Sequence, residues 1–279
     1  MTTGASASAG SDRHALAERL RALRDGTAQV AEPRHAATVV LLRDTPAGPE
    51  AYLLRRVRAM AFAAGMHVFP GGSVDPSDMT ADAAADVAWA GPPVSWWAAR
   101  FGCDEPLARA LVCAAVRETF EESGVLLAGP SADEVLADVS TDEWEAERAA
   151  LEAREHSLSE LLARRGLVLR ADLLRPFAHW ITPEAEPKRF DTRFFLAALP
   201  QGQVCRDVGG EADQRVWVRP TDALAQELVM MTPTAQSLRD VADAPDVAAA
   251  LAAPRTVTPV QPSFVLGDDD QVVFRLPGT

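Results

Sequence analysis

Short runs of apolar residues predict two neighbouring strands near the start of the chain. Residues 37–42 (A-T-V-V-L-L) and 51–57 are rich in branched and long apolar side chains, and the segment 45–49 between them contains two prolines and a glycine. This pattern is typical of two strands joined by a turn, so we expect a β-hairpin. Two further strands and a helix are predicted later in the chain, at 193–199, 215–218 and 220–227.

The two ends of the chain carry different patterns. Residues 1–11 are small and polar, which predicts a disordered segment. Residues 12–24 have leucines at helical spacing, which predicts an amphipathic helix. Its apolar side packs either on the domain or on a partner, so a homodimer is one of the arrangements left open. The C-terminal end predicts a hairpin with strands at 263–266 and 271–276.

The middle of the chain has the pattern of a helical insertion. Three segments alternate charged residues with leucine or alanine at helical spacing, at 131–139, 141–155 and 158–165. We therefore expect helices over about residues 131–166. A length of 279 residues and a hydrophobic content of 48% allow one large or two small domains. We favour a single elaborated domain over residues 12–279.

Three glutamates and an arginine are concentrated in residues 117–125, R-E-T-F-E-E-S-G-V. On a helix, Glu118, Glu121 and Glu122 stand at positions i, i+3 and i+4 and project from one face. Neighbouring carboxylates weaken a helix by about 0.2–0.5 kcal/mol per pair, so an opposing positive charge is expected. Arg117 supplies part of it, and a hard divalent cation such as Mg²⁺ or Mn²⁺ supplies the rest. The alternative is an acidic helix face that is simply solvated.

The surroundings of this helix favour the metal hypothesis. Gly124 stands where the helix is expected to end, and the apolar residues 125–127 that follow it predict the start of a strand. Upstream, residues 67–72 (H-V-F-P-G-G) predict a short strand that ends in a Pro-Gly-Gly turn. The face of the helix opposite the glutamates is apolar and is expected to be core, with Val112, Cys113, Val116 and Phe120.

The Gly71-Gly72 pair and the R-E-x-x-E-E-x-G-V segment together resemble the box of the Nudix hydrolases, G-x5-E-x7-R-E-U-x-E-E-x-G-U, where U is aliphatic. The resemblance implies an α+β fold, namely a Nudix-type α/β/α sandwich with a mixed β-sheet and a helical insertion. It also implies an enzyme, a metal-dependent hydrolase that cleaves the diphosphate of a nucleoside diphosphate linked to another group.

Under this resemblance the residues of the box receive roles. Glu121 and Glu122 are expected to be metal ligands, and Glu118 a ligand or the general base. Arg117 is expected to orient the glutamates through charge-assisted hydrogen bonds. The expected cation is Mg²⁺ or Mn²⁺.

The box is interrupted by an insertion over about residues 73–104, which is either an element that shapes the substrate site or a surface elaboration that packs its own tryptophans. Counting eight residues back from Arg117 leads to Arg109, so the first glutamate of the family pattern is missing in that register. Glu105 is the nearest acidic candidate for its place. Glu211, in a later glycine-rich loop, is a second candidate for an additional acid at the site.

A second motif concerns the substrate. The segments 53–56 (L-L-R-R) and 65–72 resemble the motif of coenzyme A diphosphatases within the Nudix group, with Ala61 where that motif has a further arginine. The insertion in the box and the segment 180–195 resemble the peroxisomal acyl-coenzyme A diphosphatase branch and its bacterial relatives. The implied reaction converts coenzyme A or acyl-coenzyme A to 3′,5′-ADP and (acyl-)4′-phosphopantetheine. The implied substrate-binding residues are Arg56, Gly71, Gly72, Lys188 and Arg189.

Composition and charge narrow the possible partners. A net charge of −13 argues against nucleic acid, because binding along a phosphate backbone needs a basic face. Three cysteines without paired spacing, Cys103, Cys113 and Cys205, indicate a reducing compartment and no structural zinc site. No apolar run is long enough to span a bilayer, and the last residues are not a peroxisomal address. We therefore expect a cytoplasmic bacterial protein whose partner is a small nucleotide substrate, with no membrane involved.

Two other functions stay open. A dinucleotide such as NADH or ADP-ribose exposes the same diphosphate as coenzyme A. A catalytically silent Nudix domain that senses nucleotides or binds proteins is the third possibility, because Arg109 stands in the place of the first glutamate and the helical insertion is large.

Overall fold

The computed structural model describes residues 4–57, 63–79, 87–209, 212–267 and 271–278. Contacts between Cα atoms divide the chain into two compact units. Unit 1 comprises Met1–His35, His179–Thr192 and Thr258–Thr279, and unit 2 comprises Ala36–Ala178 and Arg193–Val257. The residues of the box therefore all lie in unit 2.

The sheet contains the expected hairpin. Strands β1 (Arg34–Arg43) and β2 (Glu50–Arg56) pair antiparallel, with Leu42 opposite Ala51. On its other side β2 pairs antiparallel with β10 (Ala212–Val218). The predicted hairpin and the predicted strand at 215–218, which is part of β10, are thus confirmed.

The complete sheet is mixed. Its strands follow the order β10-β2-β1-β9-β8-β11, with β3 and β4 attached to β2 and β1. The pairing of β11 with β8 is parallel, whereas β3 and β4 pair antiparallel with their neighbours. The further strands are β3 (His67–Val68), β4 (Gly71–Ser73), β8 (Leu174–Ile181), β9 (Phe190–Ala198) and β11 (Pro259–Val260).

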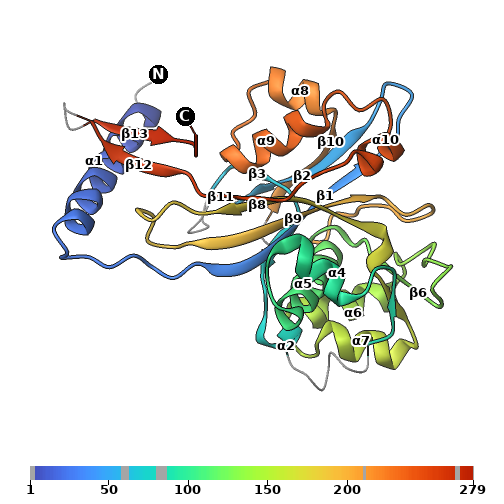
Figure 1. Ribbon diagram of the computed structural model, residues 1–279. Helices are drawn as coiled ribbons and strands as arrows, with labels where there is room; N and C mark the ends of the chain where they lie inside the picture. The colour runs from blue at the N-terminus through green and yellow to red at the C-terminus, as the bar shows by residue number, and fades with distance from the viewer. Residues whose placement is uncertain (1–3, 58–62, 80–86, 210–211, 268–270, 279) are drawn as a thin grey trace. The chain divides into compact units, whose positions relative to one another are not determined.

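Helices cover both faces of the sheet in unit 2, as Figure 1 shows. One face carries α2 (Pro76–Met79), α4 (Val94–Phe101), α5 (Glu105–Ser123), α6 (Asp142–Glu152) and α7 (Leu158–Arg165). The other face carries α8 (Pro220–Ala225), α9 (Thr232–Val241) and α10 (Val247–Ala252). This is the α/β/α sandwich that the sequence predicts.

A small second sheet accompanies the insertions. It contains β5 (Trp89–Ala90), β7 (Val168–Arg170) and β6 (Ala128–Gly129) in that order. A single 3₁₀ turn, η1 (Ala171–Leu173), joins β7 to β8. Through β5, the segment inserted in the box after β4 is part of the fold of unit 2.

Helix α5 lies at the centre of the core. The predicted apolar face is confirmed, because Val112, Cys113, Val116 and Phe120 are all buried. Helix α4, from the insertion in the box, packs on α5. Its Trp97 is fully buried, and its ring centroid lies 5.6 Å from that of Phe195 in β9. The insertion therefore contributes to the core of unit 2 and is not a separate surface elaboration.

Three segments differ from the sequence prediction. Residues 131–139 form turns and coil in place of a helix, because short polar side chains bond to the nearby backbone: Ser131 Oγ accepts from Asp133 N at 3.3 Å. Residues 125–127 are buried but are not a strand. Helix α1 (Gly4–Arg24) begins before residue 12, so residues 4–11 are helical in place of disordered.

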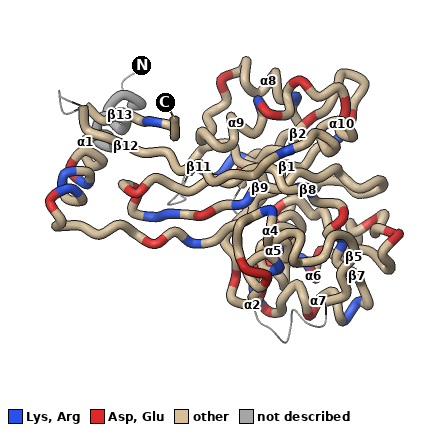
Figure 2. The backbone as a smooth tube through the Cα atoms, in the orientation of Figure 1, with Lys and Arg blue, Asp and Glu red and all other residues tan. Residues whose placement is uncertain are grey.

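Unit 1 contains α1 and the predicted C-terminal hairpin. Strands β12 (Ser263–Leu266) and β13 (Val272–Arg275) pair antiparallel, and α1 contacts both. Acidic and basic positions are interspersed along the described parts of the chain (Figure 2). Among the described helices, none combines the length and the apolar character that a membrane span requires.

Candidate active site

The glutamates occupy the last two turns of α5, and the ends of this helix are well defined. Asp104 caps its start, since the carboxylate accepts a hydrogen bond from Leu107 N at 2.9 Å. Gly124 ends it with a left-handed φ of 71°, as the sequence predicts. The register of the helix then brings Glu118, Glu121 and Glu122 to one side of its C-terminal end.

These glutamates do not form a solvated face. The side chains of Glu118 and Glu121 are only 11% and 12% exposed. Carboxylates are rarely buried to this extent unless they are paired or hold a cation. Their burial excludes the alternative of an acidic helix face that is simply solvated.

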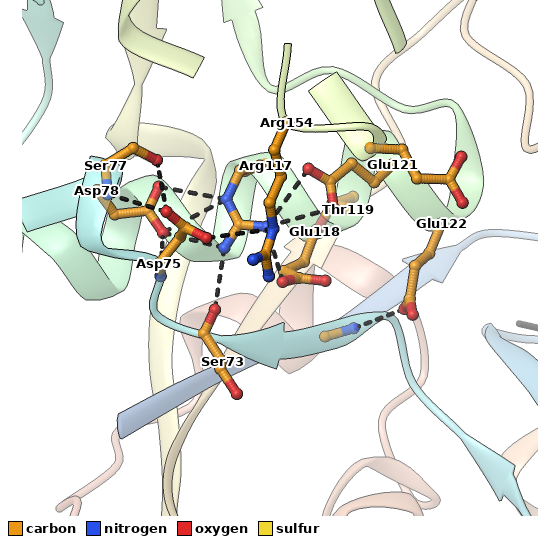
Figure 3. A network of polar contacts seen from close by, with 12 residues as sticks. Ser73, Asp75, Ser77, Asp78, Arg117, Glu118, Thr119, Glu121, Glu122 and Arg154 are labelled. Carbon is orange, nitrogen blue, oxygen red and sulfur yellow. Dashed lines mark hydrogen bonds and ion pairs between the residues drawn. The ribbon is translucent and has the colours of Figure 1, made fainter. Parts of the chain in front are cut away.

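Arg117 is the centre of a buried network of polar contacts (Figure 3). Its Nη1 donates to Glu118 Oε1 at 2.8 Å and to Glu121 Oε2 at 3.2 Å. Its Nη2 donates to Asp78 Oδ2 at 2.9 Å and to the carbonyl oxygen of Ser73 at 3.0 Å. One guanidinium thus orients two glutamates and connects them to the end of β4 and to α2.

Asp78 is the acid that the sequence analysis missed. Its side chain is 2% exposed and faces Arg117. It stands six positions after Gly72, which is the spacing of the first glutamate in the box, so the insertion falls after this acid. The count back from Arg117 crossed the insertion and arrived at Arg109, whose guanidinium instead lies 5.2 Å from the ring centroid of Trp89. Counting forward from Gly72 finds the acid.

The two glycines lie against the glutamates. Gly71 and Gly72 begin strand β4 and pair with β1, so they do not form the Pro-Gly-Gly turn that the sequence predicts. Gly71 N donates to Glu122 Oε2 at 2.8 Å. A Cβ at Gly72 would lie 2.4 Å from Glu118 Oε1, so any larger residue would displace that carboxylate. The start of β4 and the end of α5 therefore form one site, with backbone and carboxylate groups in direct contact.

The electrostatics of the cluster reflect this crowding of acids. Burial and the charge of Glu118 raise the pKa of Glu121 to about 7, although Arg117 acts in the opposite direction. Burial also raises the pKa of Asp78, against the influence of Arg117. An additional positive charge at this place would favour the ionised form of Glu121.

A divalent cation fits the chemistry of these donors. The available ligands are carboxylate oxygens on one side of a helix, which hard cations prefer. Among the described residues no three acidic, histidine or cysteine groups converge on a single point, since Glu118 and Glu121 turn to Arg117 and Glu122 turns to Gly71. Glu118, Glu121 and Glu122 are the residues that would hold the cation.

The other predicted residues that the structure describes lie on α5, on β2 and in unit 1. Glu105 is exposed at the start of α5, thirteen residues before Glu118 and hence about 20 Å from it along the helix, so the structure does not bring it to the cluster. Arg56 ends β2 opposite Ala212. In unit 1, Lys188 lies 5.3 Å from the ring centroid of Phe190, and Arg189 is buried and donates to the carbonyl oxygens of two residues, Thr182 and Ala31. Glu211 lies outside the described residues.

The sandwich, the R-E-x-x-E-E-x-G-V end of α5 and the Gly71-Gly72 pair packed against it give the chain the fold of a Nudix hydrolase. Residues 99–234 match the model of the NUDT19 Nudix domain.

Relatives and solved structures agree with this assignment. The chain is 30% identical over 212 residues to the acyl-coenzyme A diphosphatase NUDT19 of Gallus gallus, and 26% identical over 204 residues to that of Xenopus laevis. These alignments cover 60% and 63% of this chain but 55% and 54% of the relatives, so the chain spans little more than half their length. A NUDIX hydrolase from Alicyclobacillus acidocaldarius is 29% identical, with a TM-score of 0.67, and the match covers 81% of this chain and 98% of that one.

The raised pKa of Glu121 predicts a pH-dependent stability without metal. Its folded-state value is about 7 and its ordinary value is 4.5, so between these pH values the folded state binds a proton that the unfolded state has lost. The stability contributed by this group therefore falls as the pH rises from 4.5 to 7. We expect Mn²⁺ to raise the melting temperature more at pH 8 than at pH 5.5, because protons compete with the cation.

The measurement is thermal unfolding of the wild type and of Glu121→Gln, with and without Mn²⁺, at both pH values. The difference between the two proteins isolates this carboxylate from other titrating groups. An identical dependence on pH and metal in both proteins would contradict the prediction.

Proposed function

We propose that this protein is a metal-dependent diphosphatase whose substrate is coenzyme A or acyl-coenzyme A. The observation that carries the proposal is the network in which Arg117 binds Glu118, Glu121 and Asp78 while Gly71 N holds Glu122. Three of these acids surround one buried guanidinium, and the three glutamates share the end of α5, which supports a role in holding a cation near a phosphate.

The reaction is the attack of water on phosphorus. The bond between phosphorus and the bridging oxygen breaks, and 3′,5′-ADP and (acyl-)4′-phosphopantetheine leave. Glu118, Glu121 and Glu122 would hold a divalent cation, which would supply positive charge against the diphosphate and lower the pKa of a bound water.

The chain's own residues set up this chemistry. Arg117 fixes the orientation of Glu118 and Glu121, and Gly71 N fixes that of Glu122. Since these partners are buried or part-buried, the carboxylates are held in place before a substrate arrives. Because Gly72 has no side chain, the Glu118 carboxylate can lie directly against strand β4.

Two observations support coenzyme A as the substrate class. The motif at residues 53–56 and 65–72 is similar to that of coenzyme A diphosphatases. The relatives described above carry the name acyl-coenzyme A diphosphatase. The reason for a catalytically silent domain is weakened, because Asp78 supplies the acid whose absence suggested it.

Product analysis tests the proposal. The purified protein is incubated with Mn²⁺ or Mg²⁺ and a mixture of coenzyme A, an acyl-coenzyme A, NADH and ADP-ribose, and the products are identified by mass spectrometry. We expect 3′,5′-ADP together with a 4′-phosphopantetheine product. AMP from NADH or ADP-ribose would keep the reaction and change the substrate, and the absence of any cleavage would count against a diphosphatase.

A further inference from the structure

Arg154 lies at the end of α6 in an uncommon backbone conformation. Its φ is 59°, in the left-handed region. Arg154 N donates to the carbonyl oxygen of Leu151 and Glu155 N to that of Ala150, both at 2.9 Å, so Arg154 occupies the position after a helix where glycine is strongly preferred. Three other helices of unit 2, α4, α5 and α7, end on a left-handed glycine, at Gly102, Gly124 and Gly166. The arginine at this position is strained without an evident benefit to the helix.

The side chain of Arg154 reaches the edge of the acidic network. Its Nε lies 3.4 Å from Asp75 Oδ2 (Figure 3). Asp75 is tied to the same segment as Asp78, because Asp78 Oδ2 accepts from Asp75 N at 2.8 Å. The guanidinium therefore lies on the solvent side of the network whose buried side Arg117 occupies.

The ion pair with Asp75 does not explain why an arginine is there. The side chain of Arg154 is 82% exposed, and ion pairs of such exposed groups contribute little to stability. Arg117, by contrast, is buried and donates to protein groups. Arg154 thus offers a guanidinium that an incoming ligand can reach.

An anionic substrate faces a charge problem at this site. The carboxylates of Asp75, Asp78, Glu118, Glu121 and Glu122 lie around Arg117 and Arg154 (Figure 3). Arg148 also donates to the carbonyl oxygen of Glu121, but its charge is paired with Glu145 and Glu152. The negative charge of a bound diphosphate must be balanced by positively charged side chains as well as by any metal cation. The planar fork of an arginine suits phosphate oxygens, which it can bind in a bidentate manner.

We propose that Arg154 binds the diphosphate of the substrate and exchanges Asp75 for it when the substrate arrives. This inference rests on the proposed function, because it assigns a ligand to the same site. It gives the inserted helix α6 a role in binding, through a residue that the box does not contain.

The substitution Arg154→Gly separates binding from stability. Glycine relieves the left-handed backbone, so the melting temperature should stay constant or rise by about 2 °C. Binding of inorganic pyrophosphate in the presence of Mg²⁺, measured by calorimetry, should weaken by about 10- to 100-fold, as for the loss of a hydrogen bond between charged groups. Arg154→Lys keeps the charge without the fork and should be intermediate. Binding of Mn²⁺ alone should not change.

Glu227 is the matched control. It is also an exposed residue with a left-handed φ, 51°, beyond the end of α8 on the other face of the sheet. Glu227→Gly should have the same effect on stability but leave pyrophosphate binding unchanged.

The outcomes are distinguishable from those of the proposed function. If pyrophosphate binds equally to the wild type and to Arg154→Gly, or to neither, the role of Arg154 is overturned even when coenzyme A is cleaved. If pyrophosphate binding weakens as expected but no organic diphosphate is cleaved, Arg154 keeps its role and the proposed enzyme activity fails. If coenzyme A is cleaved, its KM should rise in Arg154→Gly by a factor similar to the loss in pyrophosphate binding.

Discussion

Glu122→Gln is expected to lower the turnover of coenzyme A by about 10³-fold, which corresponds to about 4 kcal/mol of transition-state stabilisation. Glutamine has nearly the same shape and can still accept the hydrogen bond that Gly71 N donates to Oε2 at 2.8 Å. The substitution removes the negative charge that would hold the cation. Because one charge leaves a crowded acidic cluster, the melting temperature should not fall.

Steady-state kinetics at saturating Mn²⁺, together with thermal unfolding, check this expectation. The control is Glu105→Gln on the same helix, which should keep normal activity because Glu105 is exposed at the far end of α5. Near-normal turnover of Glu122→Gln in a folded protein would remove the end of this helix from the mechanism.

Asp78→Ala is expected to destabilise the protein by about 3–5 kcal/mol, since it leaves the buried guanidinium of Arg117 without its most enclosed partner. This loss corresponds to a fall of about 10 °C in melting temperature. Activity should fall as well, because Arg117 also orients Glu118 and Glu121. Thermal unfolding and steady-state kinetics on the same preparation give the change in melting temperature and the change in activity.

Two variants make the Asp78 experiment specific. Asp78→Glu restores the residue type that the box has at this spacing and should recover most of the activity. Glu143→Ala removes an exposed acid that pairs with Arg165 at 2.6 Å and should change the melting temperature little. If Asp78→Ala were as stable as Glu143→Ala, the network around Arg117 would not be holding the site together.

The features that the sequence predicted correctly depend on short stretches of chain. The hairpin of β1 and β2 follows from two apolar runs and the turn between them, and the end of α5 follows from Gly124. The spacing of the three glutamates follows from the helical repeat alone. The prediction of a helix at 131–139 was wrong because hydrogen bonds between short polar side chains and the backbone competed with a weak helical pattern.

The sequence by itself determined the fold class and the Nudix box. It also determined that the three glutamates at the end of α5 share one face of a single helix. Counting forward from Gly72 and counting back from Arg117 lead to different residues, Asp78 and Arg109. The tertiary structure decided between them, because α2 packs on α5 and brings Asp78 to Arg117 across the inserted segment. The same holds for Arg154, whose place at the network depends on how α6 packs on α5. Local patterns follow from backbone geometry over a few residues, whereas contacts between distant segments depend on the packing of the whole core.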